Sequence, residues 1–142
     1  MESDWSERRQ AAARQHAAAL AAAQAVEQAK AHRLLVDFVD RLRTLGLPPV
    51  PLTAVGYSGG RYRTQVRGWY LRANASLGVD AAANYYILQV PGGWAAKLTG
   101  VTLEPSPPPL VVGRGGRDGE SIDLDELLAL RLVELTAEAA GG

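Results

Sequence analysis

The pentapeptide Gly56-Tyr57-Ser58-Gly59-Gly60 is the stretch whose residue types and spacing most resemble a reactive site. It has the G-x-S-x-G form of the turn that carries the nucleophilic serine of many hydrolases. That turn leads from a strand into a helix, and its serine needs a histidine further along the chain. Here residues 61–72 alternate as a strand does, and both histidines, His16 and His32, precede Ser58. The sequence therefore predicts a hairpin turn, with a serine hydrolase as the least supported alternative.

Arginine and tyrosine side chains are concentrated in the strand expected after this turn. Its alternation changes at Gly68, where we expect a β-bulge that reverses the inward and outward positions. The outward side chains would then share one face and form a binding site: Arg61, Arg63, Arg67, Tyr70 and Arg72. Such a face can contact phosphates and stack on bases, or bind an acidic protein. It can equally stay solvated or be covered by the acidic C-terminal helix.

A glycine-arginine loop covers residues 113–119, before the last predicted helix. It lacks the glycine spacing of a dinucleotide-binding loop and the Lys-Ser or Lys-Thr pair of a P-loop. Free amides and a following helix N-terminus still favour an anion or a partner at Arg114, Gly115, Gly116 and Arg117. Five carboxylates between residues 118 and 126 favour a loop that neutralises itself instead.

No metal or cofactor site is expected. The chain has no cysteine, and its two histidines are sixteen residues apart on one predicted helix. Neither an H-E-x-x-H motif nor a carboxylate-rich loop occurs. Asp37 and Asp40 have arginines three or four residues away, so ion pairs are expected there in place of acid–base catalysis. These patterns favour a protein that is not an enzyme.

The residues before the hairpin are expected to form one long helix over 4–45. Asp4 and Glu7 fit a capping box, and Gly46 followed by Pro48-Pro49 ends the helix. Its second half is amphipathic, whereas its first half is mainly alanine with Leu20 and Val26. The first half is thus either an exposed extension or a close-packed seam against another helix. We expect self-association, with the contact made by Leu20, Val26, Leu34 and Phe38.

After residue 46 the pattern changes to strands and turns. Strands are expected over residues 50–55, 61–72, 85–90 and 110–112, and one over 94–103 with a second bulge at Gly100. The last helix begins near Asp123. The sequence predicts an α+β fold with a long N-terminal helix, a small curved antiparallel sheet of four to five strands and a short C-terminal helix. Residues 1–46 are assigned to assembly or an extension, and residues 47–142 to a sheet domain closed by the last helix.

Charge is unevenly distributed along a chain whose formal net charge is zero. Residues 47–117 carry 7 basic and 2 acidic groups, and residues 118–142 carry 1 basic and 7 acidic groups. No signal peptide or apolar span occurs, so we expect a cytoplasmic protein without a membrane partner. The favoured function is a non-enzymatic interaction or assembly protein with a protein partner. The alternative is a nucleic-acid-binding accessory protein that uses the arginine-rich face of residues 61–72.

Overall fold

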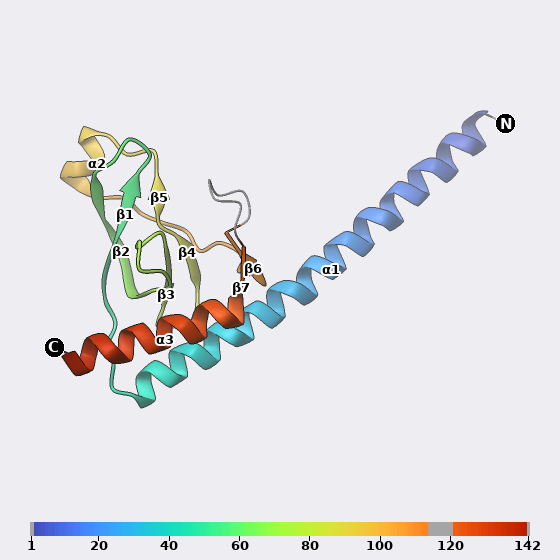
Figure 1. Cartoon of the computed structure of the whole chain (residues 1–142). Coiled ribbons are helices and arrows are strands. Elements are labelled where there is room, and N and C mark those ends of the chain that lie inside the picture. Colours follow the sequence, from blue (N-terminus) through green and yellow to red (C-terminus); the bar gives the residue numbers. More distant parts are fainter. Residues whose placement is uncertain (1, 114–120, 142) are drawn as a thin grey trace.

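The computed structural model describes residues 2–113 and 121–141, and it has the α+β fold that the sequence predicts (Figure 1). A long N-terminal helix precedes a five-stranded, mostly antiparallel sheet, and a shorter helix ends the chain. Among the described residues, no helix is long and apolar enough to cross a membrane.

The first helix, α1 (Glu2–Thr44), has two halves with different surroundings. From Ala31 onward one side of the helix is buried, with Leu35 and Phe38 at its centre. Every side chain from residue 3 to residue 30 is exposed, and Figure 1 shows this half projecting away from the sheet. Gly46 ends the helix with a φ of 72°, while Leu47 N donates to the carbonyl of Leu42 (3.0 Å). Glycine tolerates that conformation at a helix end, so the predicted stop is confirmed.

The sheet consists of β1 (Val50–Gly56), β2 (Arg61–Tyr70), β3 (Leu77–Asp80), β4 (Tyr85–Ile87) and β5 (Gln89–Val90). The strand order is β4-β3-β2-β1-β5, and only β1 with β5 is a parallel pair. β4 and β5 follow each other in the chain but lie at opposite edges of the sheet. Leu88, between them, donates its N–H to Ser76 O (2.9 Å) and accepts from Val55 N (2.8 Å). The sheet is therefore strongly curled.

Apolar side chains are buried on both faces of this sheet. On one face the helix-side core contains residues of α1, of β2 to β4 and of the last helix, α3 (Leu124–Gly141). On the other face a second core is partly covered by side chains of residues 96–103. The members of the second core are Leu52, Ala54, Tyr62, Val66, Tyr86, Leu88 and Val90. Residues 31–42 of α1 thus share a core with the sheet domain.

The β-bulge predicted at Gly68 is wrong. Tyr62 and Val66 belong to the second core, whereas Trp69 and Leu71 belong to the helix-side core, so the inward and outward positions do not reverse. The irregularity lies earlier, where residues 64–66 of β2 face the single residue 52 of β1. Two additional residues leave a period of two unchanged. The Thr64 hydroxyl fills the gap, because it donates to the carbonyl of residue 52 (2.7 Å) and accepts from Val66 N (3.1 Å).

The strand predicted over residues 94–103 is also wrong. Residues 94–99 form a short helix, α2 (Trp94–Thr99), and Gly100 ends this helix at a φ of 78° in place of forming a bulge. The chain then runs beside β2, where Val101 N donates to Arg63 O (2.8 Å). The Gln65 side chain accepts from Leu103 N (2.9 Å) and donates to the carbonyl of the same residue. Of residues 94–103, only 101–103 therefore run along β2.

Two short strands, β6 (Val111–Val112) and β7 (Ile122–Asp123), pair antiparallel and lead into α3. This helix begins one residue after the predicted start and lies beside the second half of α1 (Figure 1). Its Arg131 is 6% exposed, and Nε donates to Tyr70 O (2.7 Å). The guanidinium also pairs with Glu134 (3.2 Å) and Glu138 (3.7 Å). A buried arginine thus connects α3 to the end of β2.

Candidate functional site

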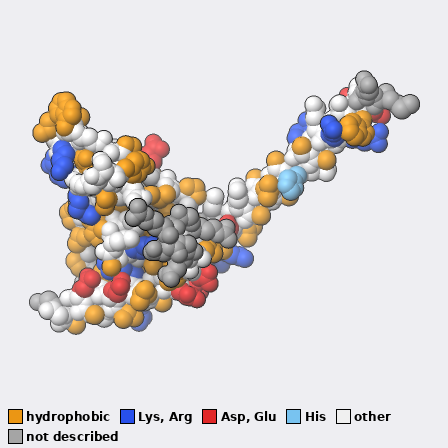
Figure 2. All heavy atoms as spheres, turned by 45° about the horizontal axis from the view of Figure 1, so that its top comes forward, with side chains coloured by type: hydrophobic (Ala, Val, Ile, Leu, Met, Phe, Trp, Pro, Cys, Tyr) orange, Lys and Arg blue, Asp and Glu red, His pale blue; other side chains and the backbone are white. Residues whose placement is uncertain are grey.

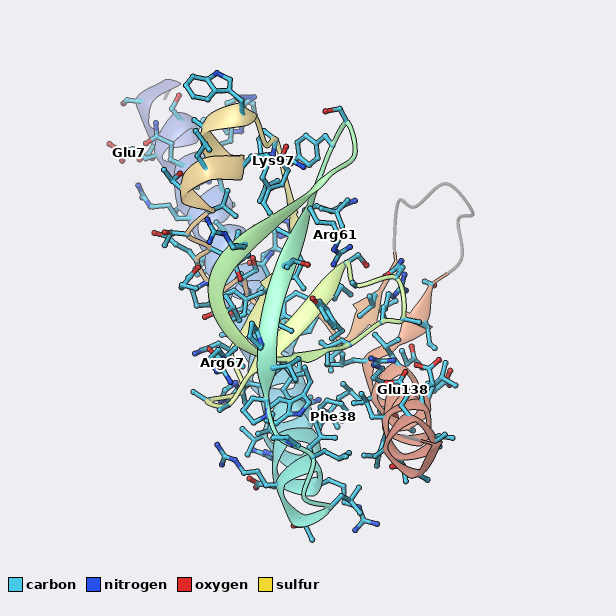
Figure 3. All side chains as sticks on the ribbon, turned by 90° about the vertical axis from the view of Figure 1, so that its left-hand side faces the viewer. Glu7, Phe38, Arg61, Arg67, Lys97 and Glu138 are labelled. Carbon is cyan, nitrogen blue, oxygen red and sulfur yellow. The ribbon has the colours of Figure 1, made fainter. Side chains whose placement is uncertain are left out.

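Three cations gather where α2 meets the β1–β2 turn. Arg61 Nε donates to Thr53 Oγ1 (2.9 Å), and Arg63 Nη2 donates to the carbonyl of Leu98 (3.0 Å). A guanidinium has five N–H donors, so each arginine keeps donors for a ligand. Lys97 of α2 comes next to the turn, with Nζ 5.9 Å from the ring centre of Tyr62. Figure 3 shows Arg61 and Lys97 beside the upper part of the β1–β2 hairpin.

We call the region of Arg61, Arg63 and Lys97 the cationic end. The sequence around it, from residue 47 to residue 103, is poor in acidic residues. Asp80 is the only acidic residue between positions 47 and 103. Its carboxylate accepts from the amides of Ala82 and Asn84 (both 2.9 Å) and from the Tyr86 hydroxyl (3.0 Å). In the part of the chain that the structure describes, the recorded ion pairs are those of Arg131 within α3. Among the described residues, no carboxylate of α3 forms an ion pair with an arginine of β2.

The five residues predicted to share the arginine face do not come together. Arg61, Arg63 and Arg67 are exposed at alternate positions of one strand, but Figure 3 shows Arg67 well down the hairpin from Arg61. Tyr70 packs against the second core, and its hydroxyl accepts from Thr53 N (3.0 Å). Arg72 follows the end of β2 and is half-buried. Only Arg61 and Arg63, joined by Lys97, form a local group.

The electrostatic environment of Tyr70 links it to this group. Burial raises the pKa of Tyr70, but hydrogen bonds with Thr53 and Arg61 and the positive charge of Arg61 outweigh it. The net pKa is lowered from the usual 10.0. The tyrosine therefore supports the position of Thr53 and Arg61, and we do not assign it a base-stacking role.

Sequence reasoning missed the carboxylate–phenol pair of Asp80 and Tyr86. Burial, the hydrogen bond to Asp80 and the charge of that carboxylate raise the pKa of Tyr86 above 10.0. The signal in the sequence was a lone acid before a turn, since Asp side chains often accept amide hydrogens two residues ahead. The pair closes the β3–β4 turn, so we regard it as a structural feature.

Tyr86→Phe should reduce the loss of stability in alkali. The raised folded pKa means that the neutral phenol stabilises the fold fully below about pH 10, and that this contribution is lost as pH rises through the folded pKa. Urea unfolding at pH 8 and pH 11 should show a smaller pH-dependent loss in Tyr86→Phe than in the parent. The exposed Tyr57→Phe is the matched control and should behave as the parent does. Equal losses in all three proteins would contradict the pairing.

The hairpin predicted at Ser58 is confirmed. Gly59 and Gly60 have φ values of 95° and 81°, and Gly56 N donates to Gly60 O (3.0 Å) across the turn. The turn lies at the end of the sheet farthest from α3 and from the packed half of α1 (Figure 1). Both histidines belong to α1, so neither follows the serine in the strand–turn–helix arrangement of a hydrolase.

The residues predicted for self-association fall into two groups. Phe38 is buried in the helix-side core, and Leu34 packs against it. Leu20 and Val26 belong to the projecting half of α1 and are 53% and 55% exposed. The anion-binding residues proposed from sequence, Arg114, Gly115, Gly116 and Arg117, lie outside the described residues.

Comparison with protein-family models, with curated proteins and with solved structures finds no match for this chain. Within residues 2–113 and 121–141, no group of three or more His, Cys, Asp or Glu side chains is placed to hold a metal ion. Two features of the described residues remain as candidates for a function: the projecting half of α1 and the group formed by Arg61, Arg63 and Lys97.

Proposed function

We propose that this protein is a non-enzymatic assembly protein that dimerises through the first half of α1 and presents its curled sheets to another macromolecule. The observation that carries this proposal is that every side chain from residue 3 to residue 30 is exposed. Near the end of this segment the Glu27 carboxylate accepts from Leu110 N (3.4 Å). These 28 helical residues extend ~42 Å at 1.5 Å per residue. A helix in a protein gains most of its stability from packing, so a bare helix of this length favours a partner.

The buried side of α1 continues into its projecting half. Leu20 lies 18 residues, or about five turns, before Phe38, and therefore on the same side of the helix. By the same geometry Trp5, Arg9, Ala13, His16 and Glu27 lie within about 60° of that line. Val26 lies about 120° away from it. We call the residues on this line the Leu20 face, which contains Leu20 and the five residues within about 60° of it but not Val26.

The charges on the Leu20 face favour a second copy in antiparallel orientation. Arg9 lies nine residues before position 18, and Glu27 lies nine residues after it. An antiparallel pair centred there brings each Arg9 opposite a partner Glu27 and each Leu20 opposite a partner His16. A parallel pair would place Arg9 beside Arg9 and Glu27 beside Glu27, which is repulsive. The antiparallel arrangement also directs the two folded ends away from each other.

Charge reversal tests both the dimer and its orientation. The parent should have twice the 15.1 kDa chain mass in light scattering, whereas Arg9→Glu and Glu27→Arg should each shift the mass towards the monomer. The double variant should recover the dimer, because the opposed charges are exchanged and not lost. A parent that is monomeric at all concentrations, or a double variant that stays monomeric, would overturn the proposal.

A matched pair of apolar variants locates the contact. Leu20→Glu should disrupt the dimer and Val26→Glu should not, although the two side chains are almost equally exposed. Circular dichroism on both variants would check that α1 remains helical. If Val26→Glu alone separated the copies, the contact would lie on a different side of the helix.

A further inference from the structure

We propose that the end of the molecule formed by α2 and the β1–β2 turn docks on an anionic lipid surface. Three large apolar side chains are strongly exposed there: Trp94 at 80%, Tyr57 at 72% and Leu98 at 68%. Contiguous apolar exposure in a folded protein commonly marks an interaction site. The proposal is independent of dimerisation through α1.

Hydrogen bonds fix each of the two exposed segments to the sheet. Tyr57 N donates to Val90 O (2.9 Å), which fixes the β1–β2 turn to β5. Gly93 N donates to the hydroxyl of Tyr62 (3.1 Å), which fixes the start of α2 to β2. Gly92 cannot carry a side chain here, because a Cβ would lie 2.5 Å from the same hydroxyl. The apolar end is therefore built onto the sheet.

The side chains at this end have the order of a membrane interface. Figure 2 shows hydrophobic side chains outermost at the end of the molecule where α2 lies, with basic side chains directly behind them. The cations of this region are Arg61, Arg63 and Lys97, and Nζ of Lys97 lies 5.9 Å from the centre of the Tyr62 ring. Trp and Tyr favour the depth of the headgroups, and Lys or Arg beside them are attracted to anionic lipids. This layering matches a surface with a negative outer layer and an apolar interior.

The shape of this end favours a lipid over a macromolecular partner. The three apolar side chains project from a six-residue helix and a short turn, so the surface protrudes. The pocket beside them is lined by residues 63–65 and 99–102, among which Val101 is the one apolar side chain, and does not provide an apolar groove for a helix. Nucleic acid would use the cations and the aromatic rings but would leave Leu98 without a role. The proposal departs from the expectation of no membrane partner, which rested on the lack of an apolar span.

Vesicle cosedimentation with the full chain tests the proposal. We expect binding to vesicles of phosphatidylcholine and phosphatidylglycerol in equal parts, and much weaker binding to phosphatidylcholine alone. Trp94→Ala with Leu98→Ala should lower the partition coefficient about tenfold or more, since both side chains lose their apolar contact. Arg63→Gln with Lys97→Gln should weaken binding mainly at low salt. Leu130→Ala with Val133→Ala, exposed positions of α3, is the matched control and should bind as the parent does.

Tryptophan fluorescence tests whether the Trp94 side chain inserts into the lipid bilayer. In a Trp5→Phe background the remaining rings are Trp94 and the buried Trp69, so quenching by lipids labelled on the acyl chain should come from Trp94. Three results would overturn the proposal. They are no sedimentation with anionic vesicles at low salt, binding unchanged by loss of Trp94 and Leu98, and retention on DNA that needs Arg61 and Arg63 without vesicle binding.

Discussion

Replacing Gly68 by alanine is expected to destabilise the fold by about 3 kcal/mol or more. A Cβ at this position would lie 1.9 Å from the carbonyl oxygen of Val79 and 2.8 Å from Cα of Asp80. Both are backbone atoms, so no side-chain movement relieves the clash. β2 is also paired on both sides here, with Val50 of β1 and with Asp80 of β3. The strand cannot move away from one neighbour without losing the other.

Urea unfolding followed by circular dichroism measures this effect, and two other glycines supply controls. Gly141→Ala should leave stability almost unchanged, because nothing lies within 4 Å of the added carbon. Gly78→Ala should fall between the two, since its nearest atom is Cδ1 of the Leu52 side chain (2.8 Å), which can shift. A loss of less than about 1 kcal/mol in Gly68→Ala would contradict the close approach of β2 and β3.

Gly68 also illustrates which parts of the fold the sequence can predict. A glycine that interrupts a period of two is typical of a bulge, and the sequence contains nothing about which backbone passes beside it. The neighbour is β3, a strand of four residues that was not predicted because Leu77–Asp80 is too short for a clear alternation. The close approach is a long-range property, whereas the ends of α1 and the hairpin at Ser58 depend on local signals and were predicted.

The error over residues 94–103 has a different cause. Trp94, Ala96 and Leu98 fit the inward positions of a strand, but Trp94 and Leu98 are also one turn apart on a helix. Over so short a segment the two periods cannot be separated. Whether residues 94–99 form a strand or a helix determines whether the apolar site exists. A strand would bury Trp94 and Leu98, whereas α2 exposes them beside Lys97. The cationic and apolar end of the molecule was therefore hidden from sequence analysis.

Arg131→Met is the second substitution expected to have a large effect, with a loss of about 2–3 kcal/mol. Methionine keeps the apolar stem but leaves Tyr70 O without the Nε donor that binds it at 2.7 Å. An unpaired buried carbonyl costs about 1–3 kcal/mol, and the ion pair with Glu134 is lost as well. Glu134 is partly exposed and can be hydrated, which keeps the loss below that of a fully buried broken pair.

The comparison with Glu138→Gln separates the two contributions of Arg131. Glu138 is 3.7 Å from the guanidinium and its side chain is 65% exposed, so its neutralisation should change stability by less than about 0.5 kcal/mol. If Arg131→Met lowers the free energy of unfolding no more than Glu138→Gln does, the hydrogen bond to Tyr70 O does not hold α3 in place. If Arg131→Met lowers it several-fold more, the connection between β2 and α3 is energetically important. Because α3 also packs against the second half of α1, that connection supports the packing of this half as well.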